Sequence, residues 1–166
     1  GRCCRFDESD ARALGRTASG VRGINIEDDD EVIGMIAYDP TAEDAQAHSL
    51  LVVSENGYGK RSDFDEYRKT NRGGKGVKTL NITEKTGNLV AIKNVTDEND
   101  LMIINRSGLT IRMAVSGIKV AGRATQGVKL INIKDGDSIA AVSAVNKSED
   151  DAPAAPQTDD QENTNE

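Results

Sequence analysis

Arg72-Gly73-Gly74-Lys75-Gly76-Val77-Lys78-Thr79-Leu80-Asn81-Ile82 decides the fold, because its pattern occurs three times in the chain. The other two copies run from Arg16 to Ile26 and from Arg123 to Ile133. Each copy reads arginine, three small or polar residues, glycine, valine, a basic residue, one variable position, an aliphatic residue, asparagine and isoleucine. Internal repeats indicate an architecture in which similar units pack against their neighbours.

The repeat extends upstream to a glycine that lies 15 residues before each arginine (16−1, 72−57, 123−108). We count positions from these glycines, so that repeat 1 starts at Gly1, repeat 2 at Gly57 and repeat 3 at Gly108. Positions +4, +11, +15 and +21 are basic in every repeat, and this constant spacing predicts one recurring basic surface. They are Arg5, Arg12, Arg16 and Arg22, then Arg61, Arg68, Arg72 and Lys78, then Arg112, Lys119, Arg123 and Lys129.

Short apolar segments between turn residues predict strands and almost no helix. The expected strands are 2–6, 21–26, 32–38, 50–54, 58–61, 80–83, 89–94, 101–105, 109–113, 131–134 and 139–145. Four hairpins are expected, joining 50–54 to 58–61, 80–83 to 89–94, 101–105 to 109–113, and 131–134 to 139–145. Asn56-Gly57 predicts a type I′ turn, and the apolar segment 32–38 predicts a buried strand.

The repeat period is near 50 residues, since the glycines are 56 and 51 residues apart (57−1, 108−57). All-β repeats of this length are typical of propeller blades. The expected fold class is therefore an all-β propeller or pinwheel, with about three blades over residues 1–147 and a disordered acidic tail over 148–166. Three blades rarely close a ring, so we expect a fragment whose unpaired strand edges favour self-association.

The net charge of −7 is carried entirely by the tail. Residues 148–166 contain seven acids and no base, which leaves 21 acids against 21 bases in the rest of the chain. Cys3 and Cys4 are adjacent and lack metal or disulfide-framework spacing, so we interpret them as small strand residues of a reducing cytoplasm. We expect His48 to be solvent-exposed and without a role. There is no membrane-length apolar run and no signal peptide.

Three blocks carry a resemblance to a known family. They are Gly57-Tyr58-Gly59-Lys60-Arg61, then Ala13-Leu14-Gly15-Arg16-Thr17 with Gly20-Val21-Arg22-Gly23-Ile24, and Gly122-Arg123-Ala124-Thr125-Gln126-Gly127-Val128. Together they resemble the C-terminal domain of the A chain of DNA gyrase, which is a bacterial type II topoisomerase. The likeness covers residues 1 to about 145 and fits the acidic tail as well. The corresponding chain of topoisomerase IV is a close relative and is kept as the alternative.

This resemblance implies a six-bladed β-pinwheel whose basic rim wraps duplex DNA and supports ATP-dependent negative supercoiling. It implies as partners duplex DNA, the remainder of the gyrase A protein and the gyrase B protein in an A2B2 heterotetramer, with no membrane partner. The cleavage tyrosine and the ATPase lie elsewhere in the family. We therefore expect a non-catalytic, cytoplasmic, chromosome-associated chain that needs no cofactor itself, whereas the complete enzyme uses ATP and Mg.

The family's gyrase A box reads glutamine, base, arginine, glycine, glycine, base, glycine. Residues 72–76 resemble its last five positions, whereas Thr70 and Asn71 depart from the first two. We interpret 72–76 as a degenerate copy in a blade loop and expect a true box upstream.

The residues themselves suggest neutralisation of the DNA backbone, in which recurring cations on a curved rim meet successive phosphates without reading bases. We expect DNA contacts at the twelve repeated cations and at Lys75, chiefly at +15 and +21, with loop glycines bringing the backbone close. The alternative is that the arginines anchor strand ends to carbonyl groups within the blades. The repeated asparagines, Asn25, Asn81 and Asn132, are expected to be structural.

Two alternatives to DNA wrapping are a protein-interaction β-propeller and an enzyme propeller. A protein-interaction β-propeller would vary its loop charges, and an enzyme propeller would need polar residues converging on a central channel. With one histidine and no phosphate-binding loop motif, the sequence offers no catalytic set. The tail could act as a DNA mimic that occupies the basic rim, or serve only as a solubilising appendage.

Overall fold

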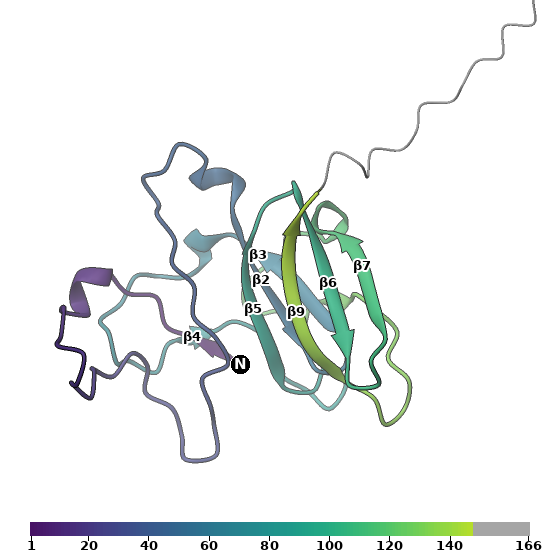
Figure 1. The fold of residues 1–166 in the computed structure, drawn as a ribbon, viewed down its shortest axis with the longest axis horizontal. Coiled ribbons are helices and arrows are strands. Elements are labelled where there is room, and N and C mark those ends of the chain that lie inside the picture. The colour runs from purple at the N-terminus through teal and green to yellow at the C-terminus, as the bar shows by residue number, and fades with distance from the viewer. Residues whose placement is uncertain (148–166) are drawn as a thin grey trace, which may run out of the picture.

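The structure, a computed structural model, describes residues 1–147 and is all-β over that range (Figure 1). This confirms the expected fold class, whereas the predicted tail, 148–166, lies outside the described residues. Single 3-10 turns occur at η1 (Glu8–Asp10), η2 (Ala45–Ala47), η3 (Phe64–Glu66) and η4 (Val115–Gly117). The strands are β1 (Arg2–Cys3), β2 (Ser49–Ser54), β3 (Tyr58–Ser62), β4 (Val77–Lys78), β5 (Leu89–Val95), β6 (Asn99–Asn105), β7 (Thr110–Ala114), β8 (Val128–Lys129) and β9 (Ile139–Asn146).

Two of the expected hairpins are confirmed, β2 with β3 and β6 with β7. The turn type predicted for the first is wrong. Gly57 has a φ of 85°, but no non-glycine residue in the described range has a positive φ, so Asn56 is not left-handed. The N–H of Gly57 donates to the carbonyl of Ser54 at 3.1 Å, which closes a three-residue loop ending in a left-handed glycine.

The other two expected hairpins are wrong. β5 pairs with β2 and β9 pairs with β6, giving sheets of order β5-β2-β3-β8 and β7-β6-β9. Segments 80–83 and 131–134 form no strand. The N–H of Gly87 donates to the carbonyl of Thr83 at 2.9 Å, closing a turn where a ladder was expected. Leu80 and Ile131 nevertheless contribute buried side chains, which explains the apolar pattern.

Strand pairing also joins one repeat to the next. β4 of repeat 2 pairs antiparallel with β1 of repeat 1, and β8 of repeat 3 pairs antiparallel with β3 of repeat 2. The register is the same in both cases, with Arg2 opposite Lys78 and Tyr58 opposite Lys129. Positions +1 and +2 of one repeat therefore always face +21 and +20 of the next.

Repeat 1 lacks two strands that the sequence predicts. Segments 21–26 and 32–38 form no strand, although the N–H of Asn25 donates to the carbonyl of Gly74 at 2.9 Å. The side chains of Val32 and Met35 are 62% and 87% exposed. Segment 32–38 occupies the position of β5 and β9, which pair with β2 and β6. None of the described strands pairs with 32–38, so the expected buried strand is wrong for want of a partner.

The core consists of two apolar clusters. The larger contains Leu51, Val53, Leu101 and Ile103 and lies between the two large sheets. The smaller contains Leu50, Val52, Phe64, Tyr67 and Leu80 and lies on the opposite face of β2, where Cys3, Ile36 and Tyr38 pack against it. Alternate residues of β2 thus feed both clusters, which is why every residue of this strand is buried.

The expectation that His48 is exposed and idle is wrong. Its Nδ1 lies 2.8 Å from Oδ1 of Asn94 on β5, and its Nε2 lies 3.1 Å from Oδ2 of Asp44. The contact with Asn94 fastens the 39–48 loop to the sheet, and the contact with Asp44 lies within the loop. Cys3 and Cys4 are half-buried free thiols, and burial raises the pKa of Cys3 to about 11.

No helix in residues 1–147 is long and apolar enough to cross a membrane. Over the same range, histidine, cysteine and carboxylate side chains form no cluster of three that would hold a metal ion.

Candidate nucleic-acid interface

The four repeated cationic positions differ in exposure. All six side chains at +11 and +21 are exposed, whereas Arg5 and Arg61 at +4, and Arg72 and Arg123 at +15, are buried or half-buried. We call these four the inter-repeat arginines, because their hydrogen bonds join neighbouring repeats.

The arginines at +4 donate forward, to the carbonyls that surround the 3-10 turn of the next repeat. Nη1 of Arg5 donates to the carbonyls of Phe64 at 2.8 Å and Tyr67 at 3.0 Å. Nε of Arg61 donates to the carbonyl of Ile118 at 3.0 Å, and its Nη1 pairs with Asp97 at 2.7 Å. Tyr67 and Ile118 both stand at +10, so the two junctions use the same contact.

The arginines at +15 donate backward, to two carbonyls of the preceding repeat. Nε of Arg72 donates to the carbonyl of Asp10 at 2.9 Å, and its Nη1 donates to the carbonyl of Arg22 at 2.6 Å. Arg123 makes the equivalent bonds to the carbonyls of Glu66 and Lys78. The acceptors stand at +9 and +21 in both junctions.

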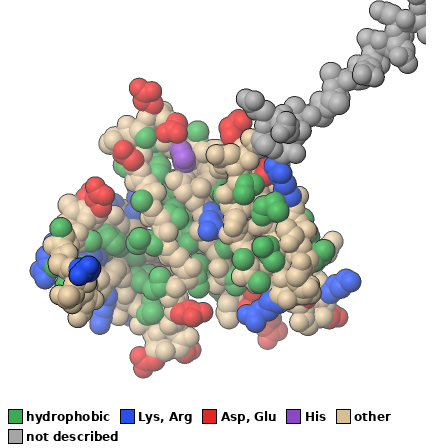
Figure 2. Space-filling model, in the orientation of Figure 1, with side chains coloured by type: hydrophobic (Ala, Val, Ile, Leu, Met, Phe, Trp, Pro, Cys, Tyr) green, Lys and Arg blue, Asp and Glu red, His purple; other side chains and the backbone are tan. Residues whose placement is uncertain are grey.

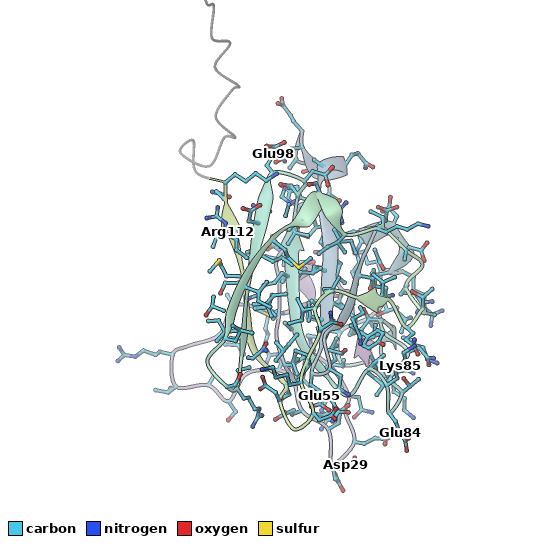
Figure 3. The ribbon with its side chains drawn as sticks, turned by 90° about the vertical axis from the view of Figure 1, so that its right-hand side faces the viewer. Asp29, Glu55, Glu84, Lys85, Glu98 and Arg112 are labelled. Atoms are coloured by element: carbon cyan, nitrogen blue, oxygen red, sulfur yellow. The ribbon has the colours of Figure 1, made fainter. Side chains whose placement is uncertain are left out.

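The remaining members of these two sets lie at the ends of the repeat series. Arg16 is exposed and forms no hydrogen bond or ion pair within residues 1–147. Nε of Arg112 on the edge strand β7 pairs with Oδ2 of Asp100 at 2.8 Å, and Figure 3 labels it at the outer margin of the β7-β6-β9 sheet.

The cations at +11 and +21 lack such internal partners. Among the described residues, their side chains form no hydrogen bond or ion pair, and neither does that of Lys75. Nζ of Lys129 lies 5.8 Å from the ring centroid of Tyr58, which leaves the ammonium group open on its other sides. We call this group the exposed cations: Arg12, Arg22, Arg68, Lys75, Lys78, Lys119 and Lys129.

Two adjoining hollows of about 380 and 340 Å³ lie between repeats 1 and 2, and Arg123 of repeat 3 borders the first. Arg2 and Arg68 border both hollows, Lys78 and Arg123 border the first, and Lys75 borders the second. Glu66 is the carboxylate on their margin. A surface with this many cations in so small an area attracts phosphate groups.

Sequence reasoning missed Arg2, which stands outside the four repeated positions. Its Nε donates to the carbonyl of Lys75 at 2.9 Å and its Nη2 to that of Gly76 at 2.6 Å. Arg2 thereby holds the glycine-rich loop on β1. Gly76 in this loop also has a structural part, since it has a φ of 70° and a Cβ there would overlap the carbonyl of Cys3. Gly76 lets two repeats approach each other. The approach of the loop backbone to DNA stays a prediction.

A signal separating the two groups of cations was present in the sequence. Positions +4 and +15 hold arginine in every repeat, whereas +11 and +21 accept lysine. A planar guanidinium can bridge two carbonyls, which a lysine ammonium does less well, so an arginine-only position indicates a bridging role.

Acidic and basic side chains both reach the surface that Figure 2 shows. Acidic ones stand out at the upper and lower tips of the molecule, and basic ones appear at the left flank and again at the lower right. Figure 3 labels Glu98 at one end of the sheets, and Asp29 and Glu84 at the other.

The three tyrosines have structural surroundings. The hydroxyl of Tyr67 lies 2.6 Å from Oγ1 of Thr79 in the core, and burial raises its pKa. Tyr58 is buried, and the ring of Tyr38 stacks on Phe64 with centroids 3.9 Å apart.

Comparison with known proteins gives concordant results. The family described as "DNA gyrase C-terminal domain, beta-propeller" matches three blocks, residues 1–39, 48–96 and 99–146, and the last two begin nine residues before Gly57 and Gly108 (57−48, 108−99). The DNA gyrase A protein of Staphylococcus epidermidis is 49% identical over 146 residues, and that of Staphylococcus aureus strain MRSA252 is 48% identical over 147. These matches cover 88% and 89% of this chain but 16% of each relative's length.

Two solved structures share the fold, both with a TM-score of 0.76. One is the DNA gyrase A C-terminal domain, 24% identical, covering 87% of this chain and 47% of that one. The other is the C-terminal domain of DNA topoisomerase IV, 19% identical, covering 88% and 44%. With the family match extending over three blocks and gyrase A relatives at nearly half identity, the chain belongs to the DNA gyrase C-terminal domain, beta-propeller family.

Proposed function

We propose that this chain binds duplex DNA along the hollows between its repeats, as a DNA-wrapping part of the gyrase A protein. The observation that carries the proposal is the division among the repeated cations. The inter-repeat arginines donate to carbonyl groups, whereas the exposed cations have no internal hydrogen bond or ion pair in the described range. Uncommitted cations at constant spacing suit a backbone of evenly spaced phosphates.

The contacts assigned to DNA are those at +11, +21 and Lys75. DNA contact at +4 and +15 stays a prediction. It is better supported at Arg16 and Arg112, whose side chains are exposed, than at Arg61, which is 8% exposed. The proposed binding is independent of base sequence, because lysine and arginine on phosphates fix position without reading bases. Each repeat presents the same cations, so the DNA would bend to follow the series.

The wider role follows from the gyrase A relatives. We infer that the chain acts with the remainder of the gyrase A protein and with the gyrase B protein, on duplex DNA, in ATP-dependent negative supercoiling in the bacterial cytoplasm. The chain itself is proposed to be non-catalytic and to need neither ATP nor Mg. The packing of Tyr58 and Tyr67 supports this, since a buried phenol is a poor nucleophile.

A salt series of duplex DNA binding tests the proposal. The wild type is compared with a triple variant, Arg68→Ala, Lys75→Ala, Lys78→Ala. Each phosphate contact contributes about 0.9 to the slope of log affinity against log salt concentration. The slope of the triple variant should therefore be shallower by up to about 2.7, with unchanged unfolding behaviour.

The matched control removes three cations away from the hollows, by Arg106→Ala, Lys134→Ala and Lys147→Ala. Its net charge equals that of the test variant, so a general electrostatic effect would alter both slopes alike. Equal slopes for the two variants, or no binding by the wild type at low salt, would overturn the proposed interface. The second result would leave a protein-interaction propeller as the better account.

A further inference from the structure

Two positions distinguish the junction of repeats 1 and 2 from the junction of repeats 2 and 3. They are +1 of the earlier repeat and +18 of the later one. At the first junction they hold Arg2 and Lys75, whereas at the second they hold Tyr58 and Gln126. The first junction therefore carries two cations that the second lacks.

The loop from +13 to +19 is otherwise fastened to the preceding repeat in the same way at both junctions. The N–H at +13 donates to the carbonyl at +4 of the earlier repeat, at 2.8 Å from both Thr70 and Ala121. The N–H of the repeated asparagine at +24 of the earlier repeat donates to the carbonyl at +17, at 2.9 Å from Asn25 and 3.1 Å from Asn81. The two extra cations are thus added to a common set of backbone bonds.

Arg2 binds the backbone of the loop that carries the other extra cation. Its Nε donates to the carbonyl of Lys75 at 2.9 Å, and its Nη2 donates to the carbonyl of Gly76 at 2.6 Å. The corresponding carbonyls of Gln126 and Gly127 receive no side-chain hydrogen bond in the part of the chain that the structure describes. One planar guanidinium therefore fixes two successive peptide groups at the first junction alone.

Lys75 is fixed through its backbone, while its side chain has no partner. The side chain is exposed on the margin of the second hollow, and its ammonium group forms no hydrogen bond or ion pair among residues 1–147. Glycines stand on both sides of it, at Gly74 and Gly76. Glycine gives a chain large conformational freedom, so a lysine between two glycines loses much entropy on meeting a phosphate unless the backbone is already held.

We propose that Arg2 is a positioning residue for DNA binding, which holds the backbone of Lys75 so that the ammonium group stays beside the hollows. The inference rests on the proposed function and adds a role to it. Arg2 itself borders both hollows, but its Nε and Nη2 are used on carbonyl groups. Its contribution to affinity is therefore assigned to order in the loop, since a group that is already ordered costs less to bind.

A double-mutant cycle of Arg2→Lys and Lys75→Ala in duplex DNA binding tests this role. Lysine keeps the charge at position 2 but does not bridge two carbonyls as a guanidinium does. Arg2→Lys should weaken binding about two- to tenfold, which is the cost of ordering one long side chain. The slope of log affinity against log salt concentration should stay that of the wild type, because no charge is lost.

In the Lys75→Ala background, Arg2→Lys should have no further effect on affinity, since the side chain that it positions is gone. Arg106→Lys is the matched control. Arg106 is exposed and away from the hollows, and its side chain forms no hydrogen bond or ion pair in the described range. This control should bind DNA like the wild type.

Hydrogen exchange gives a readout that does not use DNA. The amides of residues 73–77 should exchange faster in Arg2→Lys than in the wild type, while those of β2 keep their protection and show that the fold is intact. Unchanged exchange at 73–77 overturns the inference. So does a normal affinity of Arg2→Lys, or a loss that is equal with and without Lys75. In all three cases the wild type still binds DNA, whereas a wild type that does not bind overturns the proposed function and the inference with it.

Discussion

Lys60 is only 1% exposed, and its Nζ donates to the carbonyls of Gly122 and Arg123 in the next repeat. Burial, with Arg123 as a second cause, lowers its pKa to about 8. A lysine is therefore used here as a core hydrogen-bond donor. The equivalent position of repeat 3, +3, holds Ile111, so isoleucine is a side chain that this position of the repeat accommodates.

Replacing Lys60 by isoleucine should alter the pH dependence of stability. Between pH 8 and about 10.4 the unfolded lysine keeps a proton that the folded one has released. Across that window the free energy of unfolding of the wild type should therefore rise with pH relative to that of Lys60→Ile. The total rise should be about 1.4 kcal/mol for each unit by which the unfolded pKa of Lys60 exceeds its folded pKa. Urea unfolding of both proteins at pH 7, 8.5 and 10 measures this. A difference that stays constant with pH would contradict the lowered pKa.

His48 gives the opposite dependence. Its hydrogen bond with Asn94 and its contact with Asp44 raise its pKa, because both neighbours accept and the protonated ring donates from both nitrogens. The stabilisation is complete below the unfolded pKa, about 6.5, and is lost as pH rises through the folded pKa. His48→Gln should therefore lower Tm more at pH 5.5 than at pH 8.

Asp44→Asn is the control for the charge component of the His48 contact. It keeps a polar side chain at the same place and removes the carboxylate that faces Nε2. The pH dependence of the difference between wild type and His48→Gln should shrink when both are measured in the Asp44→Asn background. An unchanged dependence would mean that another group titrates.

At the scale of elements, local pattern predicted strands correctly where their partner lies nearby in sequence. β2 with β3, and β6 with β7, are joined by short loops, and turn residues such as Gly57 mark them. The pairing of β5 with β2 and of β4 with β1 could not be read, because it depends on contacts between segments tens of residues apart. Leu80 and Ile131 have strand-like apolar neighbours, yet both are buried outside any strand.

The candidate site was predictable to a similar degree. Spacing identified the repeated cations, but the separation into bridging and exposed members depends on which carbonyls surround each side chain. The carbonyls of Asp10 and Arg22 reach Arg72 only because β4 crosses to the preceding repeat.

Gly76 tests how tightly two repeats approach. Gly76→Ala should lower the free energy of unfolding by the cost of a left-handed alanine, about 1 kcal/mol, plus the overlap of its Cβ with the carbonyl of Cys3. Gly136→Ala carries the first cost alone, since Gly136 has a φ of 82° with nothing within 4 Å. Chemical denaturation should therefore show the larger loss at Gly76. Equal losses would mean that the backbone gives way at the junction.

At the scale of the whole molecule, the charge of residues 1–147 sums to zero, 21 bases against 21 acids, once the seven acids of 148–166 are subtracted. The proposed DNA binding therefore depends on where the cations lie. The hollows collect Arg2, Arg68, Lys75 and Lys78 from two repeats, and the bridging arginines keep those repeats in register. Under the proposed function, DNA binding and the assembly of the repeat series thus use different side chains.

If bridging and DNA-binding cations are distinct, Arg72→Ala should change stability and Lys78→Ala should change DNA binding. Arg72→Ala leaves the carbonyls of Asp10 and Arg22 without their donor, so it should lower the free energy of unfolding by about 1–3 kcal/mol. Its salt slope for duplex binding should match that of the wild type. Lys78→Ala should leave stability within about 0.5 kcal/mol and make the slope shallower by about 0.9.

Both substitutions remove one positive charge, so each controls for the other. Binding is measured well below the unfolding midpoint of Arg72→Ala, which keeps loss of the folded state out of the comparison. If Arg72→Ala instead made the slope shallower at unchanged stability, the guanidinium would be a phosphate contact and the carbonyl bonds incidental. The arginines at +15 would then be counted among the DNA-contacting cations. The repeats would be held in register by the strand pairing between them and by the arginines at +4.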